Sequence, residues 1–263
     1  DLAVTGAVTG GTINGVGIKY NITNFSESIL ISNDAGTGTL DAASSNTGLG
    51  HEVFDDLTSG DNNTAIGHQA LTKNTTGSSN TAIGIGALDA NTTANNNVAV
   101  GASSLTANTT GTANTAVGVN SLNANTTADN NTALGFLALT ANTTGHSNTS
   151  VGASSLDANT TGIRNTAVGF EALSANTDGT QNTAVGKGAL LVNTTGIENT
   201  AVGSSALDAN TTGNSNTAVG QGALDANTTA SNNTGIGHDS LKANTTGANN
   251  TAAGFSSGVS LTT

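Results

Sequence analysis

The chain has 263 residues and a formal net charge of −12, because 17 acidic residues stand against only 5 Lys and Arg. Apolar residues account for 35% of the chain and aromatic residues for 2%, which is too few for an ordinary globular core. The acidic balance argues against a nucleic-acid binder, which needs a basic surface, and no apolar run approaches the ~20 residues that cross a membrane. The absence of Cys excludes a disulfide framework and a thiolate metal site.

Residues 1–45 do not follow the pattern of the rest of the chain. The segments 2–10 and 12–20 alternate apolar and polar residues and are punctuated by Gly, which is typical of short strands. A further apolar run, Ile29–Ile31, is expected to be a degenerate coil of the array that follows. We therefore predict a β-rich N-terminal connector or cap over residues 1–45.

Residues 46–263 form an internal repeat. A Gly recurs every 17 residues in thirteen copies, without insertion or deletion, at 50, 67, 84, 101, 118, 135, 152, 169, 186, 203, 220, 237 and 254. Counted from this Gly as position 0, the residue at −1 is aliphatic, Leu stands at +4 in eleven copies, and Asn stands at −4 in all thirteen. The consensus unit is N-T-A-V-G-x-x-A-L-x-A-N-T-T-G-x-x.

A period this strict predicts an all-β fold, a parallel β-solenoid or β-roll of about thirteen 17-residue coils. A disordered chain has no need to keep Val and Leu in register, and paired-helix repeats need roughly 33–47 residues per unit. Each coil is expected to contain two short strands, T-A-V-G and A-L-x-A, and to stack on the next coil at about 4.8 Å.

The alternation of side chains along these strands predicts which positions form the core. Thr at −3 and the aliphatic residue at −1 share one side of the first strand, and Val98 at −3 in one copy indicates that this side faces inward. Leu at +4 and Ala at +6 are expected to face inward from the second strand, which leaves the small residues at −2, 0 and +3 outside. Representative ladder positions are Val117, Gly118, Leu122, Val168 and Leu173.

Two ladders of Asn are expected along the array, one at −4 and one at +7. Because an amide both donates and accepts, stacked Asn such as Asn114, Asn125 and Asn148 can bond from coil to coil. The alternative is N-glycosylation, since the Asn at +7 begins an N-T-T acceptor pattern in many copies. These candidate acceptors are Asn74, Asn91, Asn108, Asn125, Asn142, Asn159, Asn193, Asn210, Asn227 and Asn244. An amide locked in a ladder cannot also carry a sugar, whereas sugars on Thr remain open.

Candidate catalytic residues are sparse. His51, His68 and His238 follow the repeat Gly at a position that also holds Ile, Ala, Phe, Lys and Gln, so we interpret it as an outward corner. The Asp residues at +5 form a solvated stripe rather than an acid–base pair. Ile66–Leu71 matches the hexapeptide pattern of left-handed β-helix acyltransferases, but only one such hexad fits in each coil. We expect no enzyme, no catalytic residue, no cofactor and no metal site.

The repeat also carries a resemblance. The unit at Asn114–Gly118 and at Ala223–Thr229 resembles the arrays of phage tail-fibre-like and bacterial surface proteins, and Thr12–Ile18 is similar to segments that precede such arrays. More distantly, A-V-G resembles the head repeats of trimeric autotransporter adhesins, which are left-handed parallel β-rolls. The resemblance covers about residues 46–263 and implies an extracellular location, secreted, on a cell surface or on a virion.

These observations lead us to expect a non-enzymatic, self-assembling structural subunit of an extracellular fibre or filament. Its expected partner is itself, as a head-to-tail filament in which residues 1–32 pair with the last coil of the next subunit, as a trimer through the small Ala and Gly faces, or as both. Neither nucleic acid nor membrane insertion is expected.

Two alternative functions remain open at this point. The first is a receptor-binding or glycan-binding adhesin head, with cell-surface glycans as partners. The corner aromatics Phe136, Phe170 and Phe255 are too widely spaced for a sugar platform and favour a scaffold. The second is ice binding, because regular Thr arrays can order water, although T-T places neighbouring Thr on opposite sides of a strand.

Overall fold

The computed structural model describes residues 11–13, 16–22, 25–32 and 41–262. The strand-like segment expected at 2–10 therefore lies outside the described residues. The described part of the chain is all-β and contains seventeen strands. Within it there is no helix that is long and apolar enough to cross a membrane.

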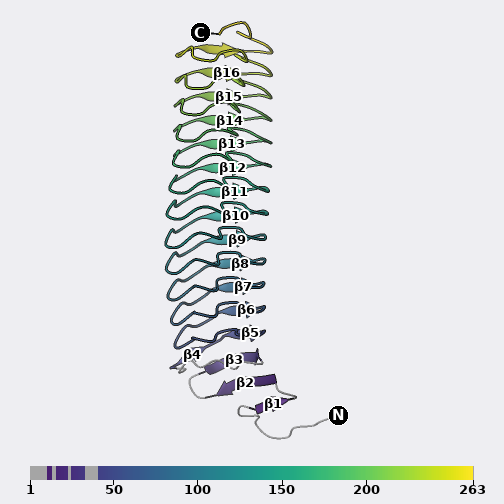
Figure 1. Cartoon of the computed structure of the whole chain (residues 1–263), viewed down its shortest axis with the longest axis vertical. Helices are drawn as coiled ribbons and strands as arrows, with labels where there is room; N and C mark the ends of the chain where they lie inside the picture. The colour runs from purple at the N-terminus through teal and green to yellow at the C-terminus, as the bar shows by residue number, and fades with distance from the viewer. Residues whose placement is uncertain (1–10, 14–15, 23–24, 33–40, 263) are drawn as a thin grey trace. The chain divides into compact units, whose positions relative to one another are not determined.

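Four strands precede the regular array, namely β1 (Gly11–Ile13), β2 (Val16–Ile22), β3 (Phe25–Ser32) and β4 (Ala43–Ser44). Each repeat copy then contributes one strand of three residues (Figure 1). These strands are β5 (Thr47–Leu49), β6 (Thr64–Ile66), β7 (Thr81–Ile83), β8 (Val98–Val100), β9 (Thr115–Val117), β10 (Thr132–Leu134), β11 (Thr149–Val151), β12 (Thr166–Val168), β13 (Thr183–Val185), β14 (Thr200–Val202), β15 (Thr217–Val219), β16 (Thr234–Ile236) and β17 (Thr251–Ala253).

The N-terminal strands lead into the array through a change of pairing direction. β1 pairs with β2 and β2 with β3 in antiparallel fashion. β3 then pairs in parallel with β5, with Ile29 opposite Thr47, Leu30 opposite Gly48 and Ile31 opposite Leu49. The apolar run Ile29–Ile31 thus takes the place that a repeat strand takes in later coils.

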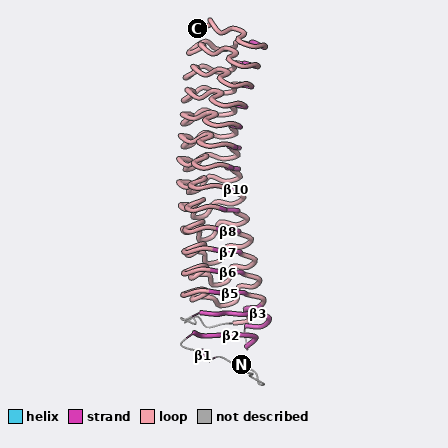
Figure 2. The backbone as a smooth tube through the Cα atoms, turned by 90° about the vertical axis from the view of Figure 1, so that its right-hand side faces the viewer, coloured by secondary structure: helices cyan, strands magenta, loops and turns pink. Residues whose placement is uncertain are grey.

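The chain divides into two compact units, 1–127 and 128–263, and both have the same construction. In the first unit β5–β9 pair in parallel, and in the second β10–β17 do the same. Each strand residue lies opposite its equivalent 17 residues on, as Val168 lies opposite Val185. In each unit the strands lie above one another, and turns complete each coil (Figure 2). The predicted parallel β-solenoid of 17-residue coils is confirmed.

The prediction of two strands per coil is wrong. The segment A-L-x-A is a series of turns, in which the Leu at +4 has a positive φ, 48° at Leu122 and 55° at Leu173. Residues at −5 and +2 are also left-handed, as at Arg164 (φ 56°) and Glu171 (φ 55°). Left-handed residues reverse the chain sharply, which allows a circuit of only 17 residues to close.

The core of each coil is built from small residues and one Leu. The inward positions are −2, +3 and +4, together with Asn at −4 and +7. The Leu at +4 is fully buried wherever it occurs between Leu71 and Leu241, as predicted. Ala or Ser at +3 is buried as well, and Ala at +6 is only half-buried, so our predicted orientation of these two positions is wrong.

The predicted orientation of the strand is also wrong, because Ala at −2 faces inward and the aliphatic residue at −1 faces out. Val168 is 36% exposed and Val117 is half-buried, whereas Ala116 and Ala167 are fully buried. The reason is space. A Cβ added at Gly235, which stands at −2, would lie only 3.3 Å from Cγ of Leu224 and 3.1 Å from O of Ser240. A methyl group fills this space, and the branched side chain of Val does not fit.

Candidate functional site

The Asn ladder at −4 is confirmed as part of the structural core. The backbone N–H of Asn165 donates to Oδ1 of Asn148 at 2.9 Å, and Nδ2 of Asn148 donates to O of Gly162 at 2.8 Å. The same bond joins the N–H of Asn114 to Oδ1 of Asn97 at 2.9 Å. Each amide therefore closes its own coil and ties it to the neighbouring coil.

The Asn ladder at +7 has a similar construction. Nδ2 of Asn125 donates to Oδ1 of Asn108 at 2.9 Å, and Nδ2 of Asn159 donates to Oδ1 of Asn142 at 2.9 Å. All ten candidate glycosylation acceptors are fully buried. In the folded coil these amides are inside, so the ladder interpretation holds and the N-T-T pattern is not an open acceptor site.

The repeat Gly forms a third ladder, in which the backbone of one coil contacts that of the next. Gly118 has φ 138° and Gly169 has φ 139°, which is a region that favours Gly. A Cβ at Gly169 would lie 2.6 Å from O of Gly186. Gly118 and its equivalents therefore allow the close packing of one coil on the next.

The outward side chains at −3 and −1 of β5–β17 make a continuous surface in each unit, which we call the strand face. Thr stands at −3 in twelve of the thirteen copies, and Val, Ile or Leu stands at −1 in twelve. No charged residue occupies −3, −2 or −1 in any copy. None of these aliphatic residues is buried: eight are exposed, from 36% at Val168 to 49% at Leu49, and the other four are half-buried.

The Thr hydroxyls distinguish this surface from the rest of the coil. Thr at +8 is used internally, as Oγ1 of Thr160 donates to O of Thr177 at 3.2 Å. The hydroxyls at −3, such as that of Thr166, make no hydrogen bond with the residues that the structure describes. The strand face therefore presents free hydroxyls beside exposed methyl groups.

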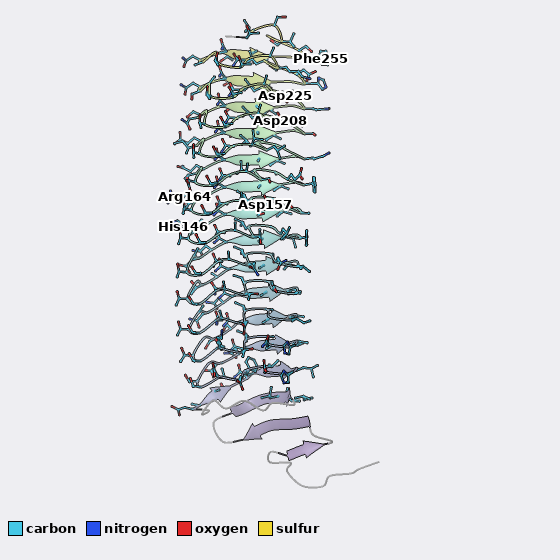
Figure 3. All side chains as sticks on the ribbon, viewed as in Figure 1. His146, Asp157, Arg164, Asp208, Asp225 and Phe255 are labelled. Atoms are coloured by element: carbon cyan, nitrogen blue, oxygen red, sulfur yellow. The ribbon has the colours of Figure 1, made fainter. Side chains whose placement is uncertain are left out.

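Five coils have Asp at +5, and only two of these Asp residues lie in successive coils. These two are Asp208 and Asp225 (Figure 3). Burial, a hydrogen bond to Asp225 and the charge of Asp225 raise the pKa of Asp208 to about 6. Asp157 has a different neighbour, because Oγ of Ser174 donates to its Oδ1 at 2.7 Å.

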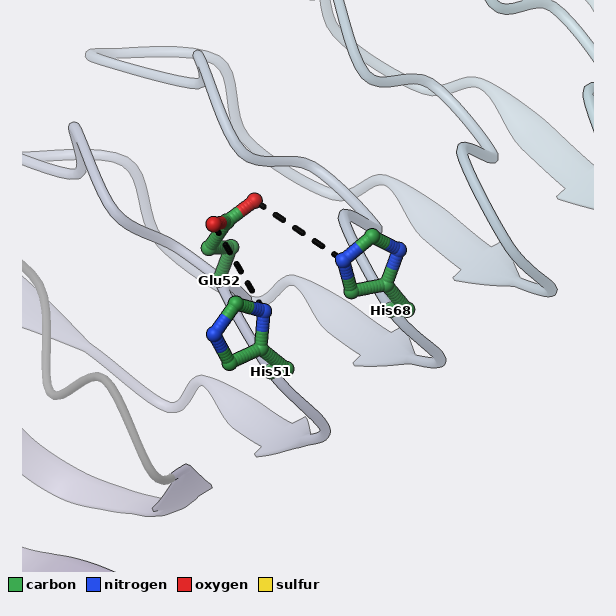
Figure 4. A group of neighbouring side chains, drawn as sticks. All are labelled: His51, Glu52 and His68. Carbon is green, nitrogen blue, oxygen red and sulfur yellow. Dashed lines mark ion pairs between the residues drawn. The ribbon is translucent and has the colours of Figure 1, made fainter.

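A second group of titratable side chains lies at the corner that follows the repeat Gly. His51 and His68 occupy the same position in successive coils, and Glu52 lies between them (Figure 4). Nδ1 of His51 is 3.6 Å from Oε1 of Glu52, and Nε2 of His68 is 3.9 Å from Oε2. The two imidazole rings are stacked, with centroids 5.2 Å apart and planes inclined by 13°.

His238 has a related environment in the second unit. Its Nδ1 is 3.4 Å from Oδ2 of Asp239, and its ring stacks on Phe255 with the same separation of 5.2 Å. Nζ of Lys242 donates to Oδ1 of Asp239 at 3.0 Å, and this carboxylate raises the pKa of Lys242. Phe255 thus stands where the first cluster has its second His.

The sequence correctly predicted that His51, His68 and His238 lie at half-exposed corners, but it did not reveal the cluster. The available signal was the spacing. His51 and His68 are one repeat apart, and Glu52 follows His51 directly. The corner aromatics Phe136, Phe170 and Phe255 are exposed, each in a separate coil.

Comparison of the chain with models of known protein families, with curated proteins and with solved structures finds no match in any of the three. A function for this chain must therefore be argued from the geometry of its own surfaces.

Proposed function

We propose that the chain is a non-enzymatic structural subunit of an extracellular fibre or filament, and that its copies associate side by side through the strand face. The observation that carries this proposal is the exposure of a regular aliphatic row at −1 on a surface without charge. Large contiguous apolar surfaces mark interaction sites in soluble proteins. The extracellular location rests on the resemblance of the repeat to fibre and surface proteins.

The distribution of charge favours a second copy of this chain as the occupant. With a net charge of −12, two copies repel each other in most orientations. Carboxylates occur at +2 and +5, as at Glu171 and Asp157, but not on the strand face. Two copies that meet at this face bring no carboxylates together.

The regularity of the strand face supports the same partner. Coils of a parallel sheet repeat at about 4.8 Å, so two copies present aliphatic rows with one common spacing. Rows of identical side chains interdigitate in dry interfaces of the steric-zipper type. The free hydroxyls at −3 can bond across such an interface. A trimer through the small faces is less favoured, because Ala at −2 and Ala or Ser at +3 lie inside the coil and only the Gly at 0 is half-exposed. Pairing of residues 1–32 with a neighbouring subunit stays a prediction.

Introducing charge on the strand face tests the proposal. We expect the wild-type chain to form fibres with rising concentration, and the double variant Val168→Lys/Val202→Lys to stay monomeric with an unchanged circular dichroism spectrum. The matched control is Phe170→Lys, since Lys187 occupies the same corner position in the next coil. Sedimentation velocity and negative-stain electron microscopy give the readout. A wild-type chain that is monomeric at all concentrations, or a double variant that assembles like the wild type, contradicts the proposal.

A second candidate function is ice binding, which the Thr row of the strand face favours. The row comes from T-A-V, in which Thr and the aliphatic residue share the outward side and the Ala between them is buried. The objection that T-T points neighbouring Thr to opposite sides does not apply to this row. Thermal hysteresis of the wild-type solution, lost in Val168→Lys/Val202→Lys, would support this function. A wild-type solution without hysteresis excludes it.

A further inference from the structure

We propose that His51, Glu52 and His68 form a binding site for a divalent transition-metal ion, with Zn²⁺ as the representative ion. One ligand atom from each of the three residues can be chosen such that all three lie within 4.8 Å of one another. Imidazole nitrogens with one carboxylate are a common donor set for Zn²⁺. This site is separate from the strand face, and it does not depend on self-association.

The distances fit a site that closes slightly when an ion enters. A tetrahedral Zn²⁺ with bonds of about 2.0–2.2 Å holds its donor atoms roughly 3.4 Å apart. The separations from Glu52 to His51 and to His68 are 3.6 and 3.9 Å. Small side-chain rotations are enough for the two contacts of Glu52. The two imidazole nitrogens lie within 4.8 Å of each other, and the stacked rings must turn toward a common point to share one ion.

The lone pairs of both imidazoles are available to an ion. The separations of 3.6 and 3.9 Å exceed hydrogen-bond length, and among the described residues neither ring makes a hydrogen bond. The two rings are stacked face to face, so their edges, which carry the ring nitrogens, are not covered by the stacking. The ion would thus complete contacts that the protein alone leaves open.

The surrounding chain orients the carboxylate and fixes the two rings. Nε2 of Gln69 donates to Oε2 of Glu52 at 2.7 Å, which is the kind of outer contact that orients a ligating carboxylate. The backbone N–H of Gln69 donates to O of His51 at 2.9 Å. The coil-to-coil pairing therefore sets the separation of the two His. Their side chains are 39% and 47% exposed, so the remaining coordination positions face solvent.

The second unit contains a built-in comparison. His238 and Asp239 repeat the His–carboxylate pair, but Phe255 replaces the second His and Lys242 binds the carboxylate. This arrangement keeps the ring stacking without the donor set. Stacking alone therefore does not explain why the first cluster has two His and a carboxylate that is bound by no Lys among the described residues.

Titration of the full-length, metal-free chain with ZnCl₂ in a calorimeter tests the site. We expect one Zn²⁺ per wild-type chain, and a loss of affinity of at least about tenfold for His68→Phe and for Glu52→Gln, since even outer contacts change affinity by this much. Phe is native at this corner position in Phe136, Phe170 and Phe255, so His68→Phe reproduces an arrangement that the fold already accommodates. Circular dichroism checks that each variant stays folded.

The matched control is His238→Phe. It removes a corner His from the cluster in the second unit, where Phe255 stands in place of a second His. We expect it to bind Zn²⁺ like the wild type. A wild-type chain that takes up no Zn²⁺ overturns the inference. So does an affinity loss in His238→Phe equal to that in His68→Phe.

Discussion

Asp208 and Asp225 stand at the same position of successive coils, and the carboxyl group of one is hydrogen-bonded to that of the other. Two carboxylates this close are difficult to ionise together. Partial burial and the neighbouring Asp225 raise the pKa of Asp208 from 3.8 to about 6. In the coil that contains Asp157, a Ser occupies the equivalent neighbouring position and donates a hydrogen bond instead.

This pair makes the stability of the chain depend on pH. Because the pKa of Asp208 is higher in the folded than in the unfolded chain, the folded chain binds a proton more tightly. The stabilisation that this proton provides is fully present below about pH 3.8 and is lost as the pH rises through about 6. Asp225→Ser removes the second carboxylate and reproduces the pairing of Asp157 with Ser174. We expect the variant to be more stable than the wild type at pH 7. At pH 4.5 the difference in stability should be smaller. Urea unfolding of both proteins at both pH values measures this, and a stability difference independent of pH would contradict it.

Truncation of a side chain should destabilise the chain strongly at an inward position of the coil and only weakly at an outward one. Leu173 is fully buried, so Leu173→Ala should reduce the free energy of unfolding by about 2–5 kcal/mol. Val168 lies on the strand face, and Val168→Ala should change it by less than about 1 kcal/mol in the monomer. Urea unfolding at low protein concentration compares the two. Equal losses would show that the orientation of the strand is wrong.

The Gly ladder should tolerate no side chain. Gly169→Ala places a Cβ at 2.6 Å from O of Gly186 at a φ of 139°, so it should prevent close stacking and cost several kcal/mol, on the order of a core truncation. Gly188→Ala is the control. It has φ 63° and its nearest neighbour is Oγ of Ser205 at 4.0 Å, so the expected cost is about 1–2 kcal/mol. Thermal unfolding ranks the two variants, and a less stable Gly188→Ala would reverse the expectation.

Removing one amide from the +7 ladder should leave buried polar atoms without partners. Nδ2 of Asn159 donates to Oδ1 of Asn142 and O of Gly162, and Oδ1 of Asn159 accepts from Asn176. Asn159→Ala is therefore expected to lower the free energy of unfolding by at least about 1–3 kcal/mol.

The control for this change is Thr144→Ala, at an exposed position of the equivalent bend in the preceding coil. Its expected effect is within about 0.5 kcal/mol, as for an ordinary surface substitution. Chemical unfolding of both variants gives the comparison. An Asn159→Ala variant as stable as the wild type would show that the ladder amides do not hold the coils together.

The architecture could be predicted from the sequence because its signal is a distance along the chain, and a strict 17-residue period needs no knowledge of side-chain orientation. The orientation of the strand could not be predicted in this way. Hydrophobicity favours Val168 over Ala167 for the interior, yet the coil is so narrow that only the smaller side chain fits. The sequence also did not reveal that each coil has only one strand. Leu173 has a left-handed backbone conformation, which Leu rarely adopts, so its segment was expected to be a strand.

The candidate metal site was missed for a related reason. Read along the chain, His51 and His68 are isolated residues at a variable corner. Only the stacking of one coil on the next converts a separation of 17 residues into neighbouring rings, with Glu52 placed between them. Within a known solenoid, residues one period apart are therefore spatial neighbours, and searching them together would have found this cluster.

The pairing of every residue with its equivalent 17 positions on has an evolutionary consequence. If residues 170–186 were removed, Val168 would meet Val202 in place of Val185, and every ladder would continue with the same kind of partner. Gain or loss of one whole coil by unequal recombination is therefore structurally almost silent, whereas a shift of a single residue disrupts all ladders at once. The gene can change the length of its product in whole coils, and selection on length can act without any need to redesign the fold.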